Sequence, residues 1–543
     1  MKRTILAISS VAILGFTTSS FISASNGFEI SKQIEVFVSF YNKLNRNYVD
    51  KTNPAELMDT AIKAITKKLD PYTKFWTEQD IEASKIRNSG QYTGIGSAIH
   101  TYEDRLYIAE PYKDFPADKS GLKAGDEVIK IDDILIEDYK GEAKDLLKGE
   151  TGTTVNVTFK RQGKIQNTDV TRSKIDVDAV PFYDLLDDNT AYIVLRKFNK
   201  KASSQTIAAL KELKARGADK VILDLRGNPG GLLTEAVNIC NIFIPKGQKI
   251  VHTESVVDSY KKVYKTKKEP IDLDIPLAVL VNGRSASASE IVSGVIQDLD
   301  RGVVVGARSF GKGLVQSTKK LKYNTLLKVT TSRYFMPSGR CIQALDYWHR
   351  DKDNKAVRTK DSDYKAFKTL NSKRTVYDGG GVLPDVEIEV AKRSSVANFL
   401  LKKRAIFDYA TNFYYKHDIK DIATFHFSET DYKDFLNYLH TTDFNYETKT
   451  EKTLEKALDY AEKEALDNDI KNEYQSLLNS IKNSKTKALD KQSKEIKQLL
   501  TNEIIKRYFY VEGKYKYDVL NSEEIKEAKI ILANKEKYSK ILQ

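Results

Sequence analysis

The chain has 543 residues, a length that allows three or four domains. Hydrophobic residues make up 41% of it and charged residues 30%, while Gly and Pro are few, so most of the chain is expected to fold around sizeable cores. The net charge of +13 comes from Lys interleaved with Glu and Asp, as on solvated helix faces. Without an arginine-rich block or a nucleic-acid motif, this charge argues against nucleic-acid binding and leaves contact with an anionic membrane surface open.

The first 25 residues predict a signal peptide. Lys2 and Arg3 precede a mostly apolar run over 5–16, and the small residues at 23–25 suit cleavage by a signal peptidase. The run is too short, and too closely flanked by Ser and Thr, for a membrane span, and no Cys follows it to carry a lipid. We expect an exported protein in the periplasm or another extracytoplasmic space. An uncleaved leader that holds the protein at the membrane is the alternative.

Four regions with different patterns follow the leader, and the first three end at residue 391. Residues 26–87 are predicted to form an N-terminal helical region, because apolar residues recur there at spacings of three and four, and Asn53-Pro54 has the residues of a helix start. Short strands separated by turn residues replace this pattern at 88–173. At 174–391, predicted strands such as VILDLRG and LAVLVNG alternate with predicted helices, which indicates α/β layers around a central sheet.

The strand-rich region at 88–173 contains a candidate binding module. Its strings YTGIGSAI and DKSGLKAGDEVIKIDDILIED resemble a PDZ domain of the bacterial, rearranged type, although Asp133 stands where a Gly is usual. The turn Gly94-Ile95-Gly96 can point backbone N–H groups into one concavity, which attracts a carboxylate, and the strand after it can pair with an extended peptide. The resemblance implies that Gly94, Ile95 and Gly96 bind the C-terminal carboxylate of a protein substrate. A tight turn without a ligand is the alternative.

Three strings in the third region carry candidate chemistry: VILDLRGNPGGLL at 221–233, VNGRSASASEIVSGVIQD at 281–298 and VVVGARSFGKGLVQS at 303–317. Gly230-Gly231 lets the backbone approach a ligand closely and can leave N–H groups free for a developing oxyanion. Ser287 stands among small residues at a strand-to-helix junction, near the free N–H groups of a helix start. Lys312 lies between two glycines after a hydrophobic strand, where burial would lower its pKa.

A serine nucleophile in these strings needs a base other than histidine. No His occurs in the three strings, and the chain has no G-x-S-x-G sequence. Lys312 is the candidate base, since Ser–Lys pairs are a variant of the catalytic triad. A lysine base has to be neutral, which from an ordinary pKa of about 10.4 requires roughly 4 to 5 kcal/mol of environmental bias at pH 7; a dry pocket can supply this.

SASASEI, FGKGLVQ and LRGNPGG together resemble the motifs of the C-terminal processing (tail-specific) peptidases, a Ser–Lys family with a crotonase-like core. The resemblance extends over residues 30–390, where YFMPSGRCIQ and DGGGVLPDVEIE also match. It implies that Ser287 is the nucleophile, that Lys312 is the general base and that Gln316 orients the lysine. It also implies an oxyanion hole formed by the backbone N–H of Ala288 and one N–H of the glycine turn, for which we favour Gly230.

The expected fold class is therefore α+β multidomain, with a crotonase-like α/β peptidase core at 174–391, an inserted PDZ β-domain at 88–173 and helical N- and C-terminal regions. The resemblance implies a secreted serine endopeptidase that recognises substrate C-termini with its PDZ domain and hydrolyses peptide bonds with a Ser–Lys dyad. Its partners would be protein substrates with accessible C-termini. The mechanism requires neither a cofactor nor a metal.

Two other functions compete with this interpretation. The segment from Gly306 to Lys312 has the spacing of a phosphate-binding P-loop, but Gly313 stands where Ser or Thr should hold magnesium, and a strand is predicted where a helix is required. The SASASEI string taken alone is also compatible with a helix cap. In that case the chain would be a catalytically inactive PDZ scaffold that binds protein C-termini.

The last region, 392–543, is predicted to be helical and carries Lys and Glu at helical spacing with a thin apolar stripe. A packed helical domain is favoured over a coiled coil or a solvated tail, and no family motif matches it. Adaptor docking, self-association through the terminal helices and substrate caging are its candidate roles. Cys240 and Cys341 either form one disulfide or remain free thiols, and their spacing does not suggest a metal site.

Overall fold

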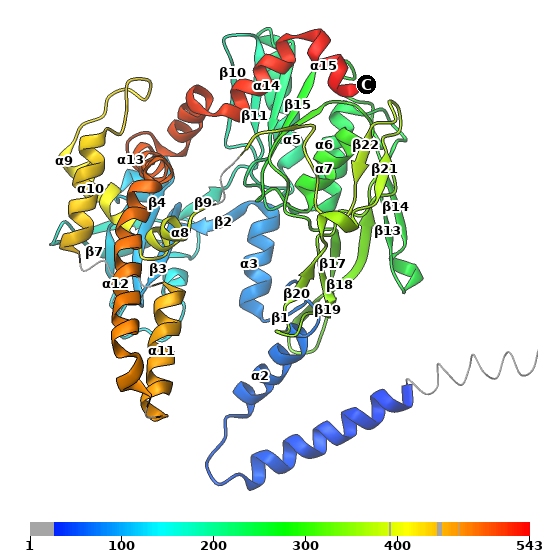
Figure 1. The fold of residues 1–543 in the computed structure, drawn as a ribbon. Coiled ribbons are helices and arrows are strands. Elements are labelled where there is room, and N and C mark those ends of the chain that lie inside the picture. Colours follow the sequence, from blue (N-terminus) through cyan, green and yellow to red (C-terminus); the bar gives the residue numbers. More distant parts are fainter. Residues whose placement is uncertain (1–26, 390–392, 443–447, 465) are drawn as a thin grey trace, which may run out of the picture. The chain divides into compact units, whose positions relative to one another are not determined.

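The computed structural model describes residues 27–389, 393–442, 448–464 and 466–543, and Figure 1 shows its helices and strands. The predicted signal peptide lies outside the described residues. The chain divides into two compact units. The smaller one comprises Met1–Thr77 and Thr318–Val329, and the larger one comprises Glu78–Ser317 and Thr330–Gln543.

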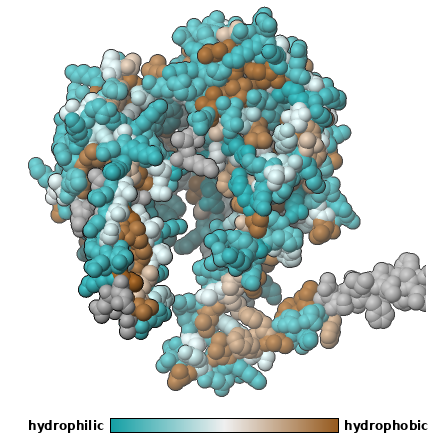
Figure 2. All heavy atoms as spheres, viewed as in Figure 1, coloured by the Kyte–Doolittle hydropathy of each residue, from teal (hydrophilic) through white to brown (hydrophobic). Residues whose placement is uncertain are grey.

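The smaller unit contains the helices predicted for the N-terminal region. Residues 27–47 are helical, and α2 (Pro54–Lys67) begins at the predicted position, where the Asn53 side chain accepts a hydrogen bond from the Glu56 amide. The first helix exposes large apolar side chains, among them Phe28 (Figure 2). Among the described residues, no helix has both the length and the apolar character that crossing a bilayer requires.

A short strand completes the smaller unit. β1 (Lys74–Trp76) pairs antiparallel with the start of β18 (Leu326–Phe335). The buried Asp70 side chain fixes the turn before β1, because its carboxylate accepts from the backbone amide and the hydroxyl of Thr73. Across the strand pair, the Lys328 ammonium lies over the Trp76 ring, 5.3 Å from its centroid.

An antiparallel sheet forms the predicted PDZ module of the larger unit. Its strand order is β3-β4-β5-β7-β8, with the short β6 paired to β5. Val155 and Val157 alternate with more exposed residues along β7 and are fully buried in the core of this module. Its elements are β3 (Ser97–Tyr102), β4 (Arg105–Pro111), α4 (Pro116–Lys119), β5 (Glu127–Ile131), β6 (Ile134–Leu135), η1 (Ala143–Leu147), β7 (Thr154–Arg161) and β8 (Lys164–Thr171).

The PDZ module is inserted between two segments that pair with each other. β2 (Gln91–Gly94) enters it, β9 (Ser173–Asp176) leaves it, and the two strands run antiparallel with Gln91 opposite Asp176. α3 (Glu78–Ser89) leads into β2. The two ends of the predicted insertion therefore lie side by side in the fold.

A six-stranded sheet is the centre of the larger unit, as the α/β alternation predicts. Its order is β10-β11-β12-β15-β16-β23; β10 is antiparallel to β11 and all other neighbours are parallel. α5, α6 and α7 pack their apolar sides against one face of this sheet. The elements are β10 (Phe182–Leu185), β11 (Thr190–Val194), α5 (Ala202–Ala215), β12 (Lys220–Asp224), α6 (Leu233–Phe243), β15 (Leu277–Val281), α7 (Ala288–Asp298), β16 (Val303–Gly306) and β23 (Val386–Glu387).

The last helices of the chain cover the other face of this sheet, as Figure 1 also shows. α14 (Glu523–Ala533) buries Ile525, Ala528 and Ile531 against Tyr192 and its neighbours on the sheet, and α15 (Lys535–Leu542) packs beside it. The sheet is thus a middle layer between helices that are more than two hundred residues apart in the chain.

Further strands flank this central sheet. β13 (Lys249–Glu254) pairs with β14 (Lys262–Lys265) and with β18, and β17 (Leu314–Lys320) also pairs with β18. Two hairpins follow β18, and their strands are β19 (Leu345–Arg350) with β20 (Ala356–Arg358) and β21 (Ala366–Lys368) with β22 (Thr375–Tyr377).

Both cysteines belong to the larger unit and both are free thiols. Cys240 is fully buried on α6, and burial raises the pKa of both thiols. The sequence left open whether Cys240 and Cys341 form a disulfide, and in the structure they do not.

The remaining C-terminal helices form a domain with its own core, as the sequence predicts. Phe435, Ile496 and Leu500 are fully buried in it. α13 is interrupted at Tyr510, whose φ of 56° is not helical. The helices are α8 (Ser395–Lys402), α9 (Ala405–Lys416), α10 (Glu429–Thr441), α11 (Lys449–Lys463), α12 (Asp467–Lys491) and α13 (Ser493–Asn521).

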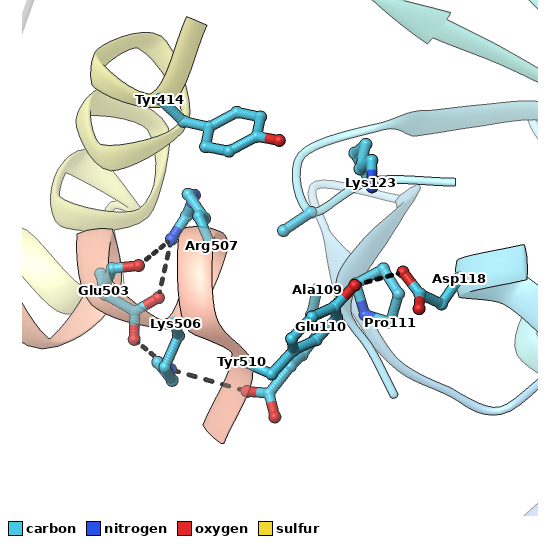
Figure 3. A pocket seen from close by; sticks show the side chains of 11 residues that line it. Ala109, Glu110, Pro111, Asp118, Lys123, Tyr414, Glu503, Lys506, Arg507 and Tyr510 are labelled. Carbon is cyan, nitrogen blue, oxygen red and sulfur yellow. Dashed lines mark hydrogen bonds and ion pairs between the residues drawn. The ribbon is translucent and has the colours of Figure 1, made fainter. Parts of the chain in front are cut away.

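The helical domain contacts the PDZ module through α9 and α13 (Figure 3). The Tyr510 hydroxyl donates to Asp118 Oδ1 on α4 at 2.8 Å, and the Lys506 ammonium lies 3.7 Å from Glu110 on β4. These groups line a pocket of only about 30 Å³, which is close to the size of one water molecule. This contact is therefore a closely packed polar interface between the helical domain and the PDZ module.

Candidate active site

Ser287 lies in a sharp turn between β15 and α7. It is half-buried, and its φ of 56° and ψ of −110° fall in a region that side-chain-bearing residues rarely adopt. Such a conformation costs about 1–3 kcal/mol and persists only where the surroundings hold it. Because the next residue is the first of α7, the serine side chain is close to a helix N-terminus, which favours negative charge.

Glu290 holds the backbone of Ser287 and that of Lys312 together. Its Oε2 accepts from the Ser287 amide at 2.8 Å and from the Lys312 amide at 2.9 Å. Its Oε1 accepts from the Ser309 hydroxyl at 2.5 Å and from the Gly311 amide at 2.6 Å. Two amide nitrogens that share one oxygen lie within about 6 Å of each other. The backbones of the predicted nucleophile and the predicted base therefore lie close together although twenty-five positions separate them in the chain.

The Glu290 side chain is fully buried. Burial raises the pKa of its carboxyl above the usual value, and hydrogen bonds from Ser309, Lys312, Gly311 and Ser287 oppose that rise. Four donors on two oxygens match the acceptor capacity of a carboxylate. Glu290 is not among the site residues predicted from the sequence, although its spacing from Ser287 is that of a capping box, in which a glutamate accepts from the N-cap amide.

Tyr334 on β18 adds a second bridge between the same two residues. Its hydroxyl lies 2.6 Å from the carbonyl oxygen of Lys312 and 3.3 Å from that of Ser287. The side chain is almost fully buried, with 1% of its surface exposed. YFMPSGRCIQ contributed to the family resemblance, but nothing in the sequence indicated that its tyrosine reaches Ser287.

The glycine turn after β12 is tied to both sides of Ser287 by Asn228. The Asn228 carbonyl accepts from the Ala286 amide at 3.0 Å and from the Ser289 hydroxyl at 2.9 Å. Its side-chain amide donates to the Leu195 carbonyl. Asn228 is fully buried, so these bonds are shielded from water. The turn is held at the start of α7.

Gly230 lies directly against Ser287. Its φ is 94°, and a Cβ at this position would be 2.6 Å from the Ala286 carbonyl oxygen and 2.9 Å from the Ser287 Cβ. Both the backbone conformation and the lack of space require glycine here. The sequence predicted a close approach of this turn to a ligand, and in the structure the turn closely approaches the backbone of Ser287.

The two predicted oxyanion donors differ in their present hydrogen bonding. Ala288 is the first residue of α7, and N–H groups in a first helical turn have no acceptor within their helix. The Gly230 N–H, in contrast, donates to the Asn228 side-chain oxygen at 2.8 Å. Stabilising an oxyanion with this group requires that bond to be shared or exchanged.

Gln316 is half-buried on β17, four residues after Lys312. Its side-chain nitrogen donates to the Thr330 hydroxyl on β18 at 3.3 Å. The segment after Lys312 is a strand, as predicted, and a P-loop requires a helix there. The geometry therefore argues against the nucleotide-binding alternative.

The carboxylate-binding turn predicted in the PDZ module opens onto a groove. Gly94 and Ile95 line a cavity of about 310 Å³ together with Ile99 on β3 and Leu147 on η1. Gly96 has a φ of 74°, and a Cβ there would lie 2.5 Å from the Phe115 side chain. Only glycine fits this turn.

The carbonyls of this turn point toward the body of the module. The Ile95 carbonyl accepts from the Ala117 amide at 2.7 Å, and the Gly96 carbonyl accepts from the Tyr112 amide at 2.9 Å. In a trans peptide the N–H points opposite to the C=O, so the N–H of Gly96 points away from α4. This orientation suits an N–H that is to bind a ligand carboxylate.

Four cations from different elements line the same groove: Arg87 on α3, Lys144 and Lys148 at η1, and Lys197 after β11. Lys144 pairs with Glu142 and Lys148 pairs with Asp145. In the part of the chain that the structure describes, Arg87 and Lys197 form no ion pair with a carboxylate. Burial, Arg196 and Arg87 lower the pKa of Lys197. The lining of the groove therefore combines apolar side chains with positive charge.

Three models of known protein families match separate parts of the chain. Residues 189–347 match the family model "Peptidase family S41", residues 93–171 match "PDZ domain", and residues 396–532 match "Probable PDZ-protease, C-terminal helical domain". The last match covers a region for which the sequence analysis found no family motif.

Two curated relatives are described as "Probable CtpA-like serine protease". The one from Staphylococcus haemolyticus (strain JCSC1435) is 34% identical over 306 residues, which are 56% of this chain and 61% of the relative. The one from Staphylococcus aureus (strain MRSA252) is also 34% identical, over 309 residues and the same shares. The chain thus spans about three fifths of the length of these relatives.

Among solved structures, the "Photosystem II D1 C-terminal processing protease" is 26% identical, with a TM-score of 0.35 over 65% of this chain and 92% of that one. The sequence matches agree with each other and with the three motifs around Ser287. On these matches, the chain is similar to peptidase family S41 over residues 189–347, to PDZ domains over residues 93–171 and to the C-terminal helical domain of probable PDZ-proteases over residues 396–532.

Proposed function

We propose that this protein is a serine endopeptidase that binds substrate C-termini in its PDZ groove and hydrolyses peptide bonds with Ser287 and Lys312. The observation that carries the proposal is the Glu290 carboxylate, which accepts hydrogen bonds from the amides of both residues. A helix cap alone does not require the carboxylate to be fully buried or to bind a second segment. The carboxylate shared by Ser287 and Lys312 therefore favours an enzyme over an inactive PDZ scaffold.

The proposed reaction has two halves that share one base. Lys312, neutral before the reaction, takes the hydroxyl proton of Ser287 as the serine oxygen attacks the scissile carbonyl carbon. The resulting oxyanion accepts from the Ala288 N–H and from the Gly230 N–H once its bond to Asn228 is exchanged. The lysinium then protonates the leaving amine, and an acyl-enzyme forms.

Hydrolysis of the ester completes the cycle. Lys312, neutral again after it has given its proton to the amine, accepts a proton from a water molecule that attacks the acyl carbon. The second oxyanion collapses, the new carboxylic acid leaves, and the lysinium returns the proton to Ser287. Gln316 is proposed to orient the lysine from β17, four residues away along the chain.

The test of this function is mass spectrometry of cleavage products from one test protein that ends in an apolar tail. We expect the wild-type chain to cut the tailed protein and to cut a version without its last residues much more slowly. Ser287→Ala should give no products from either. A wild-type chain that binds the tail without any Ser287-dependent cleavage would make it a scaffold.

A groove variant provides the matched control for this experiment. Ile99→Glu places a carboxylate among the apolar residues of the PDZ groove, where it repels the terminal carboxylate of the tail. We expect it to slow cleavage of the tailed protein and to leave cleavage of a short tailless peptide unchanged. Equal cleavage of the tailed protein by this variant would remove the groove from the proposal.

We also propose that residues 1–25 direct export and are removed, so that the protein acts outside the cytoplasm. The support is the charged start, apolar run and small residues at 23–25. N-terminal sequencing of protein recovered from the producing cells is expected to begin near residue 26. An intact Met1 on the exported protein would instead favour an uncleaved anchor at the membrane.

A further inference from the structure

The end of the chain reaches the strand that carries the glycine turn. Arg226 Nη1 donates to the Ser522 hydroxyl at 2.7 Å and lies 3.0 Å from Glu524 Oε2. The Ser522 hydroxyl in turn donates to Glu524 Oε2 at 2.7 Å. Ser522 caps α14 and Glu524 lies in its first turn. Nearly three hundred positions separate these residues from Arg226.

The same arginine is held from the other side by Asp224 at the end of β12. Its Nη2 donates to Asp224 Oδ2 at 2.6 Å, and its Nε lies 3.1 Å from both oxygens of that carboxylate. The Tyr192 hydroxyl donates to Asp224 at 2.7 Å. The side chains of Arg226, Asp224 and Glu524 are 14%, 5% and 17% exposed, so the cluster is largely shielded from water.

The pKa values of both carboxylates in the cluster lie below their usual range. Burial acts to raise the pKa of Glu524 and of Asp224, but the charge of Arg226 outweighs it together with hydrogen bonds from Arg226, from Ser522 to Glu524 and from Tyr192 to Asp224. Loss of either carboxylate would leave the other as the main partner of a buried guanidinium. Removal of one partner from such a group is costly, because the charge that remains is not compensated.

Arg226 begins the turn that faces Ser287. Its carbonyl accepts from Arg196 Nη1 at 2.8 Å, and the next amide, of Gly227, donates to the Asn282 side chain at 3.0 Å. Asn228 follows and holds the start of α7 through the Ala286 amide. The oxyanion turn therefore extends from the residue whose side chain the C-terminal segment holds.

We propose that Ser522 and Glu524 are positioning residues of the catalytic site, which fix the 227–231 turn against Ser287 through Arg226. Neither touches the substrate. The inference rests on the proposed function and extends it, because it gives the C-terminal helices a part in catalysis besides covering the sheet. It follows that a chain cut after α13 loses an element of its active site as well as part of its core.

The test uses Glu524→Gln in the full chain. The amide keeps the size of the side chain and can still accept from Ser522, but it removes the charge that faces Arg226. We expect kcat for a short peptide to fall by about tenfold or more with KM little changed, because small displacements of catalytic groups are costly. Ser522→Ala should give a smaller loss in the same direction, and it replaces Glu524→Gln if that variant does not fold.

Glu527→Gln is the matched control. Glu527 lies on the same helix and pairs with Lys537 at 2.7 Å, away from Arg226. This variant has the same chemical change in α14 and should keep the wild-type kcat. A loss of kcat equal to that of Glu524→Gln would mean that any weakening of α14 lowers activity, and it would overturn the positioning role.

A second measurement separates this inference from the proposed function. Hydrogen exchange of a peptide that covers residues 225–231 should become faster in Glu524→Gln and remain at the wild-type rate in Glu527→Gln. Unchanged exchange in Glu524→Gln would refute the inference, whatever happens to kcat. If the wild-type chain shows no Ser287-dependent hydrolysis, the proposed function fails, and the exchange rates alone decide whether the C-terminal segment fixes the turn.

Discussion

Lys312→Ala is expected to lower kcat for a tailed substrate by roughly 10⁴-fold while it leaves the affinity for the tail unchanged. The amino group is the only proposed acceptor for the Ser287 proton, and alanine offers no replacement. The backbone of residue 312 should stay in place, because its amide and carbonyl are held by Glu290 and Tyr334. Steady-state kinetics and fluorescence anisotropy with a labelled tail peptide measure the two quantities separately.

Two further variants sharpen this prediction. Lys312→Arg keeps a positive charge but cannot be deprotonated near neutral pH, so it should be as inactive as the alanine variant if the residue acts as a base. Lys360→Ala removes an exposed lysine of the same domain and should have wild-type activity. Substantial hydrolysis by Lys312→Arg would mean that the residue contributes charge and that another group takes the proton.

Glu290→Gln is expected to have the second large effect, on both activity and stability. An amide offers one oxygen where the carboxylate offers two, and its NH₂ group would face two donors, either the amides of Ser287 and Lys312 or the donors of Ser309 and Gly311. Each buried donor left without a partner costs about 1–3 kcal/mol. We expect kcat to fall at least about a hundredfold, because the two catalytic segments lose their common anchor.

Glu235→Gln separates the loss of stability from the loss of catalysis. Glu235 is also a buried glutamate in the first turn of a helix, and it accepts from the Ser203 amide at 2.8 Å, but on α6 and away from Ser287. Thermal unfolding should show that both variants are less stable than the wild type. Only Glu290→Gln should lose turnover at a temperature where both are folded, and equal activities would assign Glu290 a structural role alone.

Several features of the fold are local in the sequence and were predicted correctly for that reason. The α/β alternation, the insertion of the PDZ module and the helix start at Asn53 depend on residue periodicity and on single turn residues. The Gly230 turn is similar, since it requires φ values and a close approach that only glycine allows. The family matches confirm the resemblance to a peptidase with a PDZ domain that the short motifs indicated.

The contacts that assemble the candidate site are not local, and the sequence did not predict them. Tyr334 reaches Ser287 and Lys312 only because β17 and β18 lie beside each other, and no pattern in its own segment indicates that neighbour. The spacing of Glu290 from Ser287 fits a capping box, but its bond to the Lys312 amide depends on the loop after β16. Sequence patterns define an element and its buried face, and they do not identify what covers that face.

The C-terminal helices show the same limit over a longer distance. Their apolar stripe predicted packed helices, which the structure contains, but the stripe of α14 fits any apolar surface of suitable shape. The sequence by itself determined which elements form and which turns require glycine, since these depend on neighbours in the chain. Only the tertiary structure decided that α14 covers the central sheet and that Glu524 meets Arg226, because burial and charge pairing depend on which surfaces come together when the whole chain folds.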